Sequence, residues 1–252
     1  MRTKTVAANW KMNMTPKEAK GLLDRLLPEI KNADVDIIIC TPFVSLQTAL
    51  DCVEGTNIKI GAENMYFEDK GAYTGEISPV MLKEIGVTHV ILGHSERRKY
   101  FGETNEIVNK KILKALEHGL VPMACCGESL EIRGDGLAKQ YIHRQMMEML
   151  QGVPKGDVCK CIFSYEPIWA IGTGIGATKE QAEEGCTEIR RSVASIYGEE
   201  TARNVTVLYG GSVNPANADT IFNINDIDGG LLGTASLNMD FAKVVRIREK
   251  YD

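Results

Sequence analysis

The sequence predicts an α/β fold, a (β/α)8 barrel in which eight parallel strands are surrounded by outer helices. Eight short apolar runs rich in β-branched residues alternate with segments of helical spacing, as they do in repeated βα units. The ends of the first and eighth runs, Asn9 and Gly233, are 224 residues apart, which gives 32 residues for each of seven steps. This even spacing favours closure into a barrel over an open, doubly wound sheet.

The eight apolar runs are the expected strands, and each one ends at or beside a glycine or a polar residue. Their continuous apolar character is typical of parallel strands that helices cover. In chain order the runs read TVAANW, VDIIICTP, NIKIGAE, HVILGH, VPMACCGE, CIFSYEP, VTVLYGG and IDGGLLG.

Helical spacing is clearest in TNEIVNKKILKALEHG, where Val108, Ile112 and Ala115 share one face and Gly119 follows as a stop signal. The sequence contains no linker and no low-complexity tract, so we expect residues 1–252 to form a single barrel domain. Four other segments read as helices in the same way: PKEAKGLLDRLLPEIK, GLAKQYIHRQMMEMLQG, KEQAEEGCTEIRRSVASIYG and DFAKVVRIREKY.

The composition argues against several classes of protein. The 29 basic and 34 acidic side chains are evenly spread without a basic block, so a nucleic-acid partner is not expected. No apolar run is long enough for a membrane span or a signal peptide, which favours a soluble, cytoplasmic protein without a membrane partner. The seven cysteines lack the spacing of a zinc site, so we expect no metal and reduced thiols that pack as small apolar side chains in apolar runs: Cys40, Cys125, Cys126, Cys159 and Cys161.

An active site in such a barrel forms where the strands end at their carboxyl side, so the residues there are the candidates for chemistry. Most of them are unremarkable alone. They are Asn9, Lys11, Thr41, Glu63, His94, Glu128, Glu166, Gly210, Gly211 and Gly233.

His94 follows the fourth strand and precedes SERRKYFG, where a helical turn begins. The partial positive charge at the start of a helix disfavours a protonated imidazole, and a neutral imidazole can donate a hydrogen bond to a substrate carbonyl. The alternative is that His94 only caps backbone groups. We expect His89, His118 and His143 to be structural.

Glu166 ends the sixth strand and precedes a proline and the apolar residues 168–171. A carboxylate covered by such a loop would lose solvation and become a stronger base. The alternative is that Glu166 belongs to a structural network of ion pairs. Possible members of this network follow directly after His94: Glu96, Arg97 and Arg98.

Glycines are concentrated after strands six, seven and eight, and the loops after strands seven and eight are where such barrels bind a phosphate through backbone N–H groups. Lys11 is the nearest expected cation. Residues 172–177 also match the GxGxxA pattern of dinucleotide sites, but the pattern does not follow a first strand and the next strand ends without an acid for a ribose. The glycines are Gly172, Gly174, Gly176, Gly210, Gly211, Gly229, Gly230 and Gly233.

Six motifs, in this order along essentially the whole chain, resemble the triosephosphate isomerase family: NWKMN, GAYTGEIS, ILGHSERR, YEPIWAIGTG, YGGSV and GLLGTASL. The resemblance implies a TIM barrel that interconverts dihydroxyacetone phosphate and D-glyceraldehyde 3-phosphate, a reaction of glycolysis and gluconeogenesis, through an enediolate and without cofactor or metal. It also implies a homodimer in which Thr74 reaches the partner's site.

The resemblance further implies a role for each matching residue. Asn9 and Lys11 would bind substrate and assist catalysis, His94 would be the neutral electrophile, Glu166 the base, and Glu96 would orient the electrophilic side. Residues 167–177 would form a lid that keeps water from the enediolate. The phosphate would accept backbone N–H bonds from Gly172, Ser212, Gly233 and Thr234.

Three positions depart from the pattern of the family. The lid ends in Ile175-Gly176-Ala177 where a Lys-Thr-Ala or Lys-Ser-Ala sequence is frequent, and Thr234 replaces a usual glycine. Glu63 replaces a common glutamine near the expected dimer contact, where burial would raise its pKa unless Lys11, Arg97 or Arg98 holds it ionised.

Two other functions stay open on sequence grounds. A sugar-phosphate aldolase or lyase of the Schiff-base type would need a lysine at an inner strand end, and Lys11 is the candidate. The second alternative is an inactive barrel that serves as a scaffold. The presence of Lys11, His94 and Glu166 argues against it.

Overall fold

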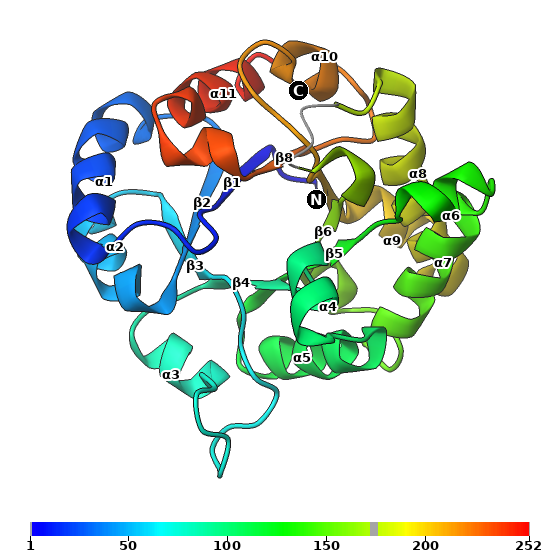
Figure 1. Ribbon diagram of the computed structural model, residues 1–252, viewed down its shortest axis with the longest axis horizontal. Helices are drawn as coiled ribbons and strands as arrows, with labels where there is room; N and C mark the ends of the chain where they lie inside the picture. The colour runs from blue at the N-terminus through cyan, green and yellow to red at the C-terminus, as the bar shows by residue number, and fades with distance from the viewer. Residues whose placement is uncertain (1, 172–175, 252) are drawn as a thin grey trace.

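The computed structural model describes residues 2–171 and 176–251 and contains a closed barrel of eight parallel strands in the order β1 to β8 (Figure 1). The fold predicted from the even spacing of apolar runs is therefore confirmed. The strands are β1 (Thr5–Asn9), β2 (Asp36–Thr41), β3 (Lys59–Ala62), β4 (His89–Leu92), β5 (Val121–Cys126), β6 (Ile162–Tyr165), β7 (Thr206–Tyr209) and β8 (Gly229–Leu232).

Helices surround the barrel on its outside, as Figure 1 shows. The five segments with helical spacing all form helices. Helix α5 ends just before Gly119, whose φ of 65° lies in the left-handed region that glycine adopts without strain, and this glycine terminates the helix as predicted. The helices are α1 (Pro16–Ile30), α2 (Leu46–Val53), α3 (Pro79–Glu84), α4 (Ser95–Phe101), α5 (Asn105–Glu117), α6 (Leu130–Gly134), α7 (Ala138–Met149), α8 (Lys179–Tyr197), α9 (Glu199–Asn204), α10 (Ala218–Phe222) and α11 (Asp240–Arg248). The described residues also form the short 3-10 helices η1 (Phe43–Ser45), η2 (Val158–Lys160), η3 (Ile168–Ala170) and η4 (Thr234–Leu237).

The barrel has two separate apolar cores, which explains why its strands are apolar along their whole length. Alternate side chains of a strand point to opposite faces, so in β2 Ile37 and Ile39 pack outward against the helices while Ile38 and Cys40 fill the barrel interior. The interior cluster consists of Ala7, Ile38, Cys40, Ile91, Met123, Cys125, Ile162, Leu208 and Leu231.

The cysteines are unpaired, and most of them behave as small apolar side chains. Cys40, Cys125, Cys126 and Cys161 are buried as expected. The expectation is wrong for Cys159, which is exposed because it lies on the short turn η2 before the sixth strand.

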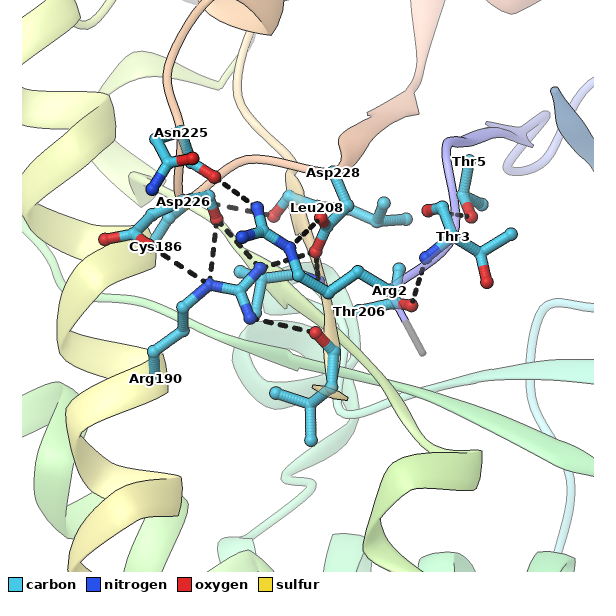
Figure 2. Close-up of polar contacts among 12 residues, drawn as sticks. Arg2, Thr3, Thr5, Cys186, Arg190, Thr206, Leu208, Asn225, Asp226 and Asp228 are labelled. Carbon is cyan, nitrogen blue, oxygen red and sulfur yellow. Dashed lines mark hydrogen bonds and ion pairs between the residues drawn. The ribbon is translucent and has the colours of Figure 1, made fainter. Parts of the chain in front are cut away.

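The amino-terminal end of the barrel is closed by ion pairs around Asp228 (Figure 2). Its carboxylate accepts bonds from Arg2 Nε at 2.6 Å, from Arg190 at 2.5 Å and from the backbone N–H of Val207 at 2.7 Å. Asp228 directly precedes β8, so this network lies at the opposite end of the strands from their carboxyl termini.

Between β3 and α3 the chain forms a long loop that projects from the barrel (cyan in Figure 1). Thr74 lies in its exposed part. No helix in the described part of the chain is long and apolar enough to cross a membrane.

Candidate active site

A cavity of about 400 Å³ opens at the carboxyl ends of the strands. It brings together most of the residues that the sequence singled out: Asn9, Lys11, His94, Glu166, Gly210, Gly211, Ser212, Gly233 and Thr234. Three lining residues had no signal in the sequence, Asn214, Asn238 and Asp240, because the path of their loops decides which side chains face the cavity. Gly172 and Gly174 lie outside the described residues, and Thr41, Glu63 and Glu128 do not line the cavity.

Glu166 and His94 lie next to each other in the wall of the cavity. His94 Nε2 lies 3.1 Å from Glu166 Oε1, without the alignment of a hydrogen bond, and the backbone N–H of Ser95 donates to Glu166 Oε2 at 2.8 Å. The side chain of Glu166 is 2% exposed. The salt-bridge alternative for Glu166 is wrong, because Arg97 pairs with Glu103 and the guanidinium of Arg98 donates to backbone carbonyls and an asparagine.

The helix that follows β4 determines how the imidazole of His94 is oriented. His94 is the N-cap of α4, and its Nδ1 accepts the backbone N–H of Glu96 at 3.2 Å. Because Nδ1 accepts a bond, the proton of a neutral ring is on Nε2, the atom that faces Glu166. His94 therefore caps the helix and lines the cavity at once, so the capping alternative does not exclude a catalytic role.

Lys11 reaches the cavity from a strained backbone position. Its φ of 55° is in the left-handed region, which is costly for a residue with a side chain and is frequent at functional sites. Its Nζ lies 2.8 Å from Glu96 Oε1, while Glu96 Oε2 is 3.6 Å from His94 Nδ1. Glu96 thus stands between the cation and the imidazole.

Glycines at the strand ends make room for Glu166, a role that the sequence did not reveal. A Cβ at Gly127 would lie 1.7 Å from the carbonyl oxygen of Glu166, and one at Gly210 would lie 3.0 Å from Glu166 Cγ. At Gly211 a Cβ would lie 2.1 Å from the hydroxyl of Tyr209. These positions need glycine for close packing, whatever their amides bind.

Glu63 is partly buried beside the site. Burial raises the pKa of Glu63 to about 8, although a hydrogen bond from the backbone N–H of Lys11 partly opposes this rise. The charge of Glu96 raises this pKa further, and the charge of Lys11 lowers it. Glu63 Oε1 has no hydrogen-bond partner among the described residues. The alternative in which Arg97 or Arg98 holds Glu63 ionised is wrong, because both guanidinium groups bind elsewhere.

The three other histidines have structural partners. His89 is buried on β4, where burial and then the charge of Lys59 lower its pKa to about 3. His118 Nε2 lies 2.7 Å from Asp69, and His143 Nδ1 lies 3.0 Å from the hydroxyl of Ser192.

The fold and the cavity define a class of protein: a (β/α)8 barrel with a carboxylate beside an imidazole at the carboxyl ends of its strands. Comparison with known proteins makes the assignment specific. The family model described as triosephosphate isomerase matches residues 4–248. The chain therefore belongs to the triosephosphate isomerase family.

Individual relatives agree with the family model. Proteins named triosephosphate isomerase from Thermoanaerobacter sp. (strain X514) and from Clostridium botulinum (strain Loch Maree / Type A3) are 52% and 51% identical over 246 residues, or 97% of this chain and 99% of each relative. The protein of that name from Acetivibrio thermocellus is 48% identical over 248 residues, or 98% of this chain and 99% of the relative. These matches favour an isomerase over the lyase and scaffold alternatives.

Proposed function

We propose that Glu166 is the base and His94 the neutral electrophile in the interconversion of dihydroxyacetone phosphate and D-glyceraldehyde 3-phosphate, the reaction of this family. The observation that carries the proposal is the 3.1 Å approach of His94 Nε2 to Glu166 Oε1 in the cavity that Lys11 also lines. A substrate carbon and its carbonyl oxygen that enter this cavity meet a base and a hydrogen-bond donor together.

The proposed step begins when the Glu166 carboxylate takes a proton from the carbon beside the substrate carbonyl. The electron pair of the broken C–H bond moves toward the carbonyl oxygen, where the Nε2–H of His94 stabilises the charge of the enediolate. Glu166 then returns the proton to the former carbonyl carbon, while the hydroxyl proton of the first carbon moves to the former carbonyl oxygen, so that the carbonyl and the hydroxyl exchange places.

Lys11 is the proposed cation of the site, and Asn9 contributes beside it. The backbone N–H of Lys11 donates to Asn9 Oδ1 at 3.1 Å, which ties the two residues together. Glu96 holds the Lys11 ammonium at 2.8 Å and is the proposed orienting residue on the electrophilic side. Among the described residues that line the cavity, Lys11 is the one lysine or arginine.

The phosphate is proposed to bind at the glycine-rich side of the cavity. Ser212, Gly233 and Thr234 line it, and their backbone N–H groups are the candidate donors, together with that of Gly172. Lys11 extends toward this side, since a Cβ placed on Gly233 would lie 3.8 Å from its Nζ. The proposed lid spans residues 167–177, of which 172–175 lie outside the described residues.

Deuterium from solvent distinguishes this mechanism from a hydride shift within the substrate. In D2O the protein should place solvent deuterium in the product, because the proton that Glu166 removes exchanges before it returns. His94→Gln should lower the rate by about a hundredfold or more, since the enediolate loses its donor. Product formed without solvent deuterium would contradict the proposed enediolate.

A homodimer is the proposed assembly. Exposed apolar side chains follow the neighbouring strands β1 to β4, where a partner could cover them, and the loop that carries Thr74 projects from the same part of the barrel (Figure 1). These side chains are Met12, Val44, Tyr73, Met81 and Phe101.

Mixing two impaired variants tests whether Thr74 completes the partner's site. In a mixed dimer, the Thr74→Arg subunit keeps its own Glu166 and receives an unchanged Thr74 from a Glu166→Gln subunit. We therefore expect the mixture to regain activity after subunit exchange. A mixture as inactive as its components, or a monomer in sedimentation analysis, would overturn the proposed dimer contact.

The family assignment also bears on the location, the domain organisation and the cofactor use of the protein. We infer a cytoplasmic enzyme in which residues 1–252 form one domain, since the family model spans nearly the whole chain. We also infer activity without cofactor or metal, because proton transfer by Glu166 and His94 needs neither. Full activity after exhaustive dialysis against a chelator is the expected result.

A further inference from the structure

Beside the cavity, the buried carboxylate of Glu128 accepts hydrogen bonds from three side chains. Glu128 follows β5 and its side chain is fully buried. Its Oε1 accepts bonds from the hydroxyl of Tyr165 at 3.0 Å, from Trp169 Nε1 at 2.9 Å and from Arg133 at 2.9 Å. A buried carboxylate is costly without a countercharge, and Arg133 on α6 supplies it.

Two of these three donors flank the proposed base. Tyr165 immediately precedes Glu166, and Trp169 follows it by three residues in η3. Burial and the charge of Glu128 raise the pKa of Tyr165, so its hydroxyl stays a donor. Backbone bonds join the same segments, because the N–H of Glu166 donates to the carbonyl of Cys126 at 2.7 Å.

Arg133 makes further contacts on the far side of the base. Its second nitrogen donates to Glu184 of α8 at 2.6 Å, and its guanidinium lies 5.3 Å from the centre of the Trp169 ring. One planar group therefore connects the end of β5, the turn after Glu166 and α8. The fork of a guanidinium can bind two carboxylates at once in fixed directions, which an ammonium group does less well.

We propose that Arg133 is a positioning residue for the base: by holding the Glu128 carboxylate between Tyr165 and Trp169, it fixes both sides of Glu166. The inference rests on the proposed role of Glu166 as the base. Arg133 itself does not line the cavity, so it acts on the base only through other residues. Its effect is on where the Glu166 carboxylate stands relative to the substrate carbon, and small displacements there are costly in rate.

The test compares Arg133→Met and Arg133→Lys with a matched control, Lys139→Met. Lys139 lies 3.3 Å from the other oxygen of Glu184, so the control removes a neighbouring cation from Glu184 and leaves Glu128 with its three donors. We expect Arg133→Met to lower kcat by about tenfold or more with KM within about twofold. Arg133→Lys should fall between this variant and the parent, and Lys139→Met should match the parent.

Fluorescence gives a readout of the surroundings of Trp169 that does not depend on activity. The chain has two tryptophans, so a Trp10→Phe background leaves Trp169 as the single emitter. Arg133→Met should shift the Trp169 emission, and Lys139→Met should leave it unchanged. If Arg133→Met does not fold, Arg133→Lys decides alone: a lower kcat at the melting temperature of the parent supports the proposal, and an unchanged kcat overturns it.

The outcomes also separate this inference from the proposed function. An active Glu166→Gln variant would overturn the proposed role of Glu166 as the base, and the positioning role of Arg133 would then fall as well. An inactive Glu166→Gln variant beside an Arg133→Met variant with the kcat of the parent would overturn the positioning role alone. Equal losses in Arg133→Met and Lys139→Met would also overturn it, because the effect would then follow the charge at Glu184.

Discussion

The backbone N–H of Ser95 donates to Glu166 Oε2 at 2.8 Å, so the first residue of α4 holds the carboxylate that its neighbour His94 faces. The same helix start thus orients both members of the proposed acid–base pair: it fixes the imidazole through its N-cap and the carboxylate through its first free N–H.

Ser95→Pro tests this hydrogen bond with little other change. Proline is tolerated at the first position of a helix, and His94 already has the extended backbone that a residue before proline prefers. Without the N–H, the Glu166 carboxylate loses the donor that holds its Oε2 in place, so kcat should fall by about tenfold or more.

Ser95→Ala is the control, because it removes the hydroxyl and keeps the N–H. Its kcat should match that of the parent. Equal kcat values for Ser95→Pro and the parent would show that this bond does not position the proposed base.

Gly127→Ala should displace Glu166 through its backbone. The added Cβ would lie 1.7 Å from the carbonyl oxygen of Glu166, a contact that only movement of β5 or β6 can relieve. We expect a clear loss of melting temperature together with a lower kcat in the protein that remains folded.

Gly134→Ala on α6 is the matched control, since its Cβ would meet no atom within 4 Å. Activity and melting temperature should stay near those of the parent. If Gly127→Ala behaved like this control, the close packing of β5 against Glu166 would not matter for function.

Glu63→Gln should stabilise the protein in a pH-dependent way. The folded-state pKa of Glu63, about 8, exceeds the ordinary value of 4.5, so the folded protein favours the protonated form. Stability that this group contributes is present below the unfolded pKa and is lost as pH rises toward the folded pKa. Glutamine keeps the shape of the protonated acid and cannot ionise.

The melting temperature of Glu63→Gln should therefore exceed that of the parent by a margin that is small near pH 5 and larger near pH 8. Each kcal/mol of relief corresponds to about 2–4 °C for a chain of this size. Both proteins must be melted at the same concentration, because a dimer is stabilised by mass action. A margin that does not grow with pH would refute the buried-acid explanation.

Local patterns in the sequence predicted the fold because both faces of every strand are buried. Residues such as Ile37 and Ile38 point to different cores, yet both must be apolar, so the runs are continuous and easy to locate. The equal spacing of these runs then indicated closure. The burial of Cys159 was predicted wrongly because residues 158–160 form a short 3-10 turn before the strand.

The candidate site was predictable only where a residue stands at a strand end or in a family motif. The pairing of Arg97 with Glu103, which leaves Glu166 to His94 and Ser95, depends on how α4 packs and leaves no mark in local sequence. The same holds for Gly127, where a side chain would collide with the backbone of Glu166, the residue that follows the neighbouring strand.

The most direct test of the central claim is the rate of isomerisation of D-glyceraldehyde 3-phosphate by Glu166→Gln relative to the parent, measured in a coupled assay. Glutamine keeps the shape of the side chain and removes its basicity, so we expect binding of a substrate analogue to persist and kcat to fall by several powers of ten. A variant that isomerises within about tenfold of the parent would contradict the assignment of Glu166 as the base.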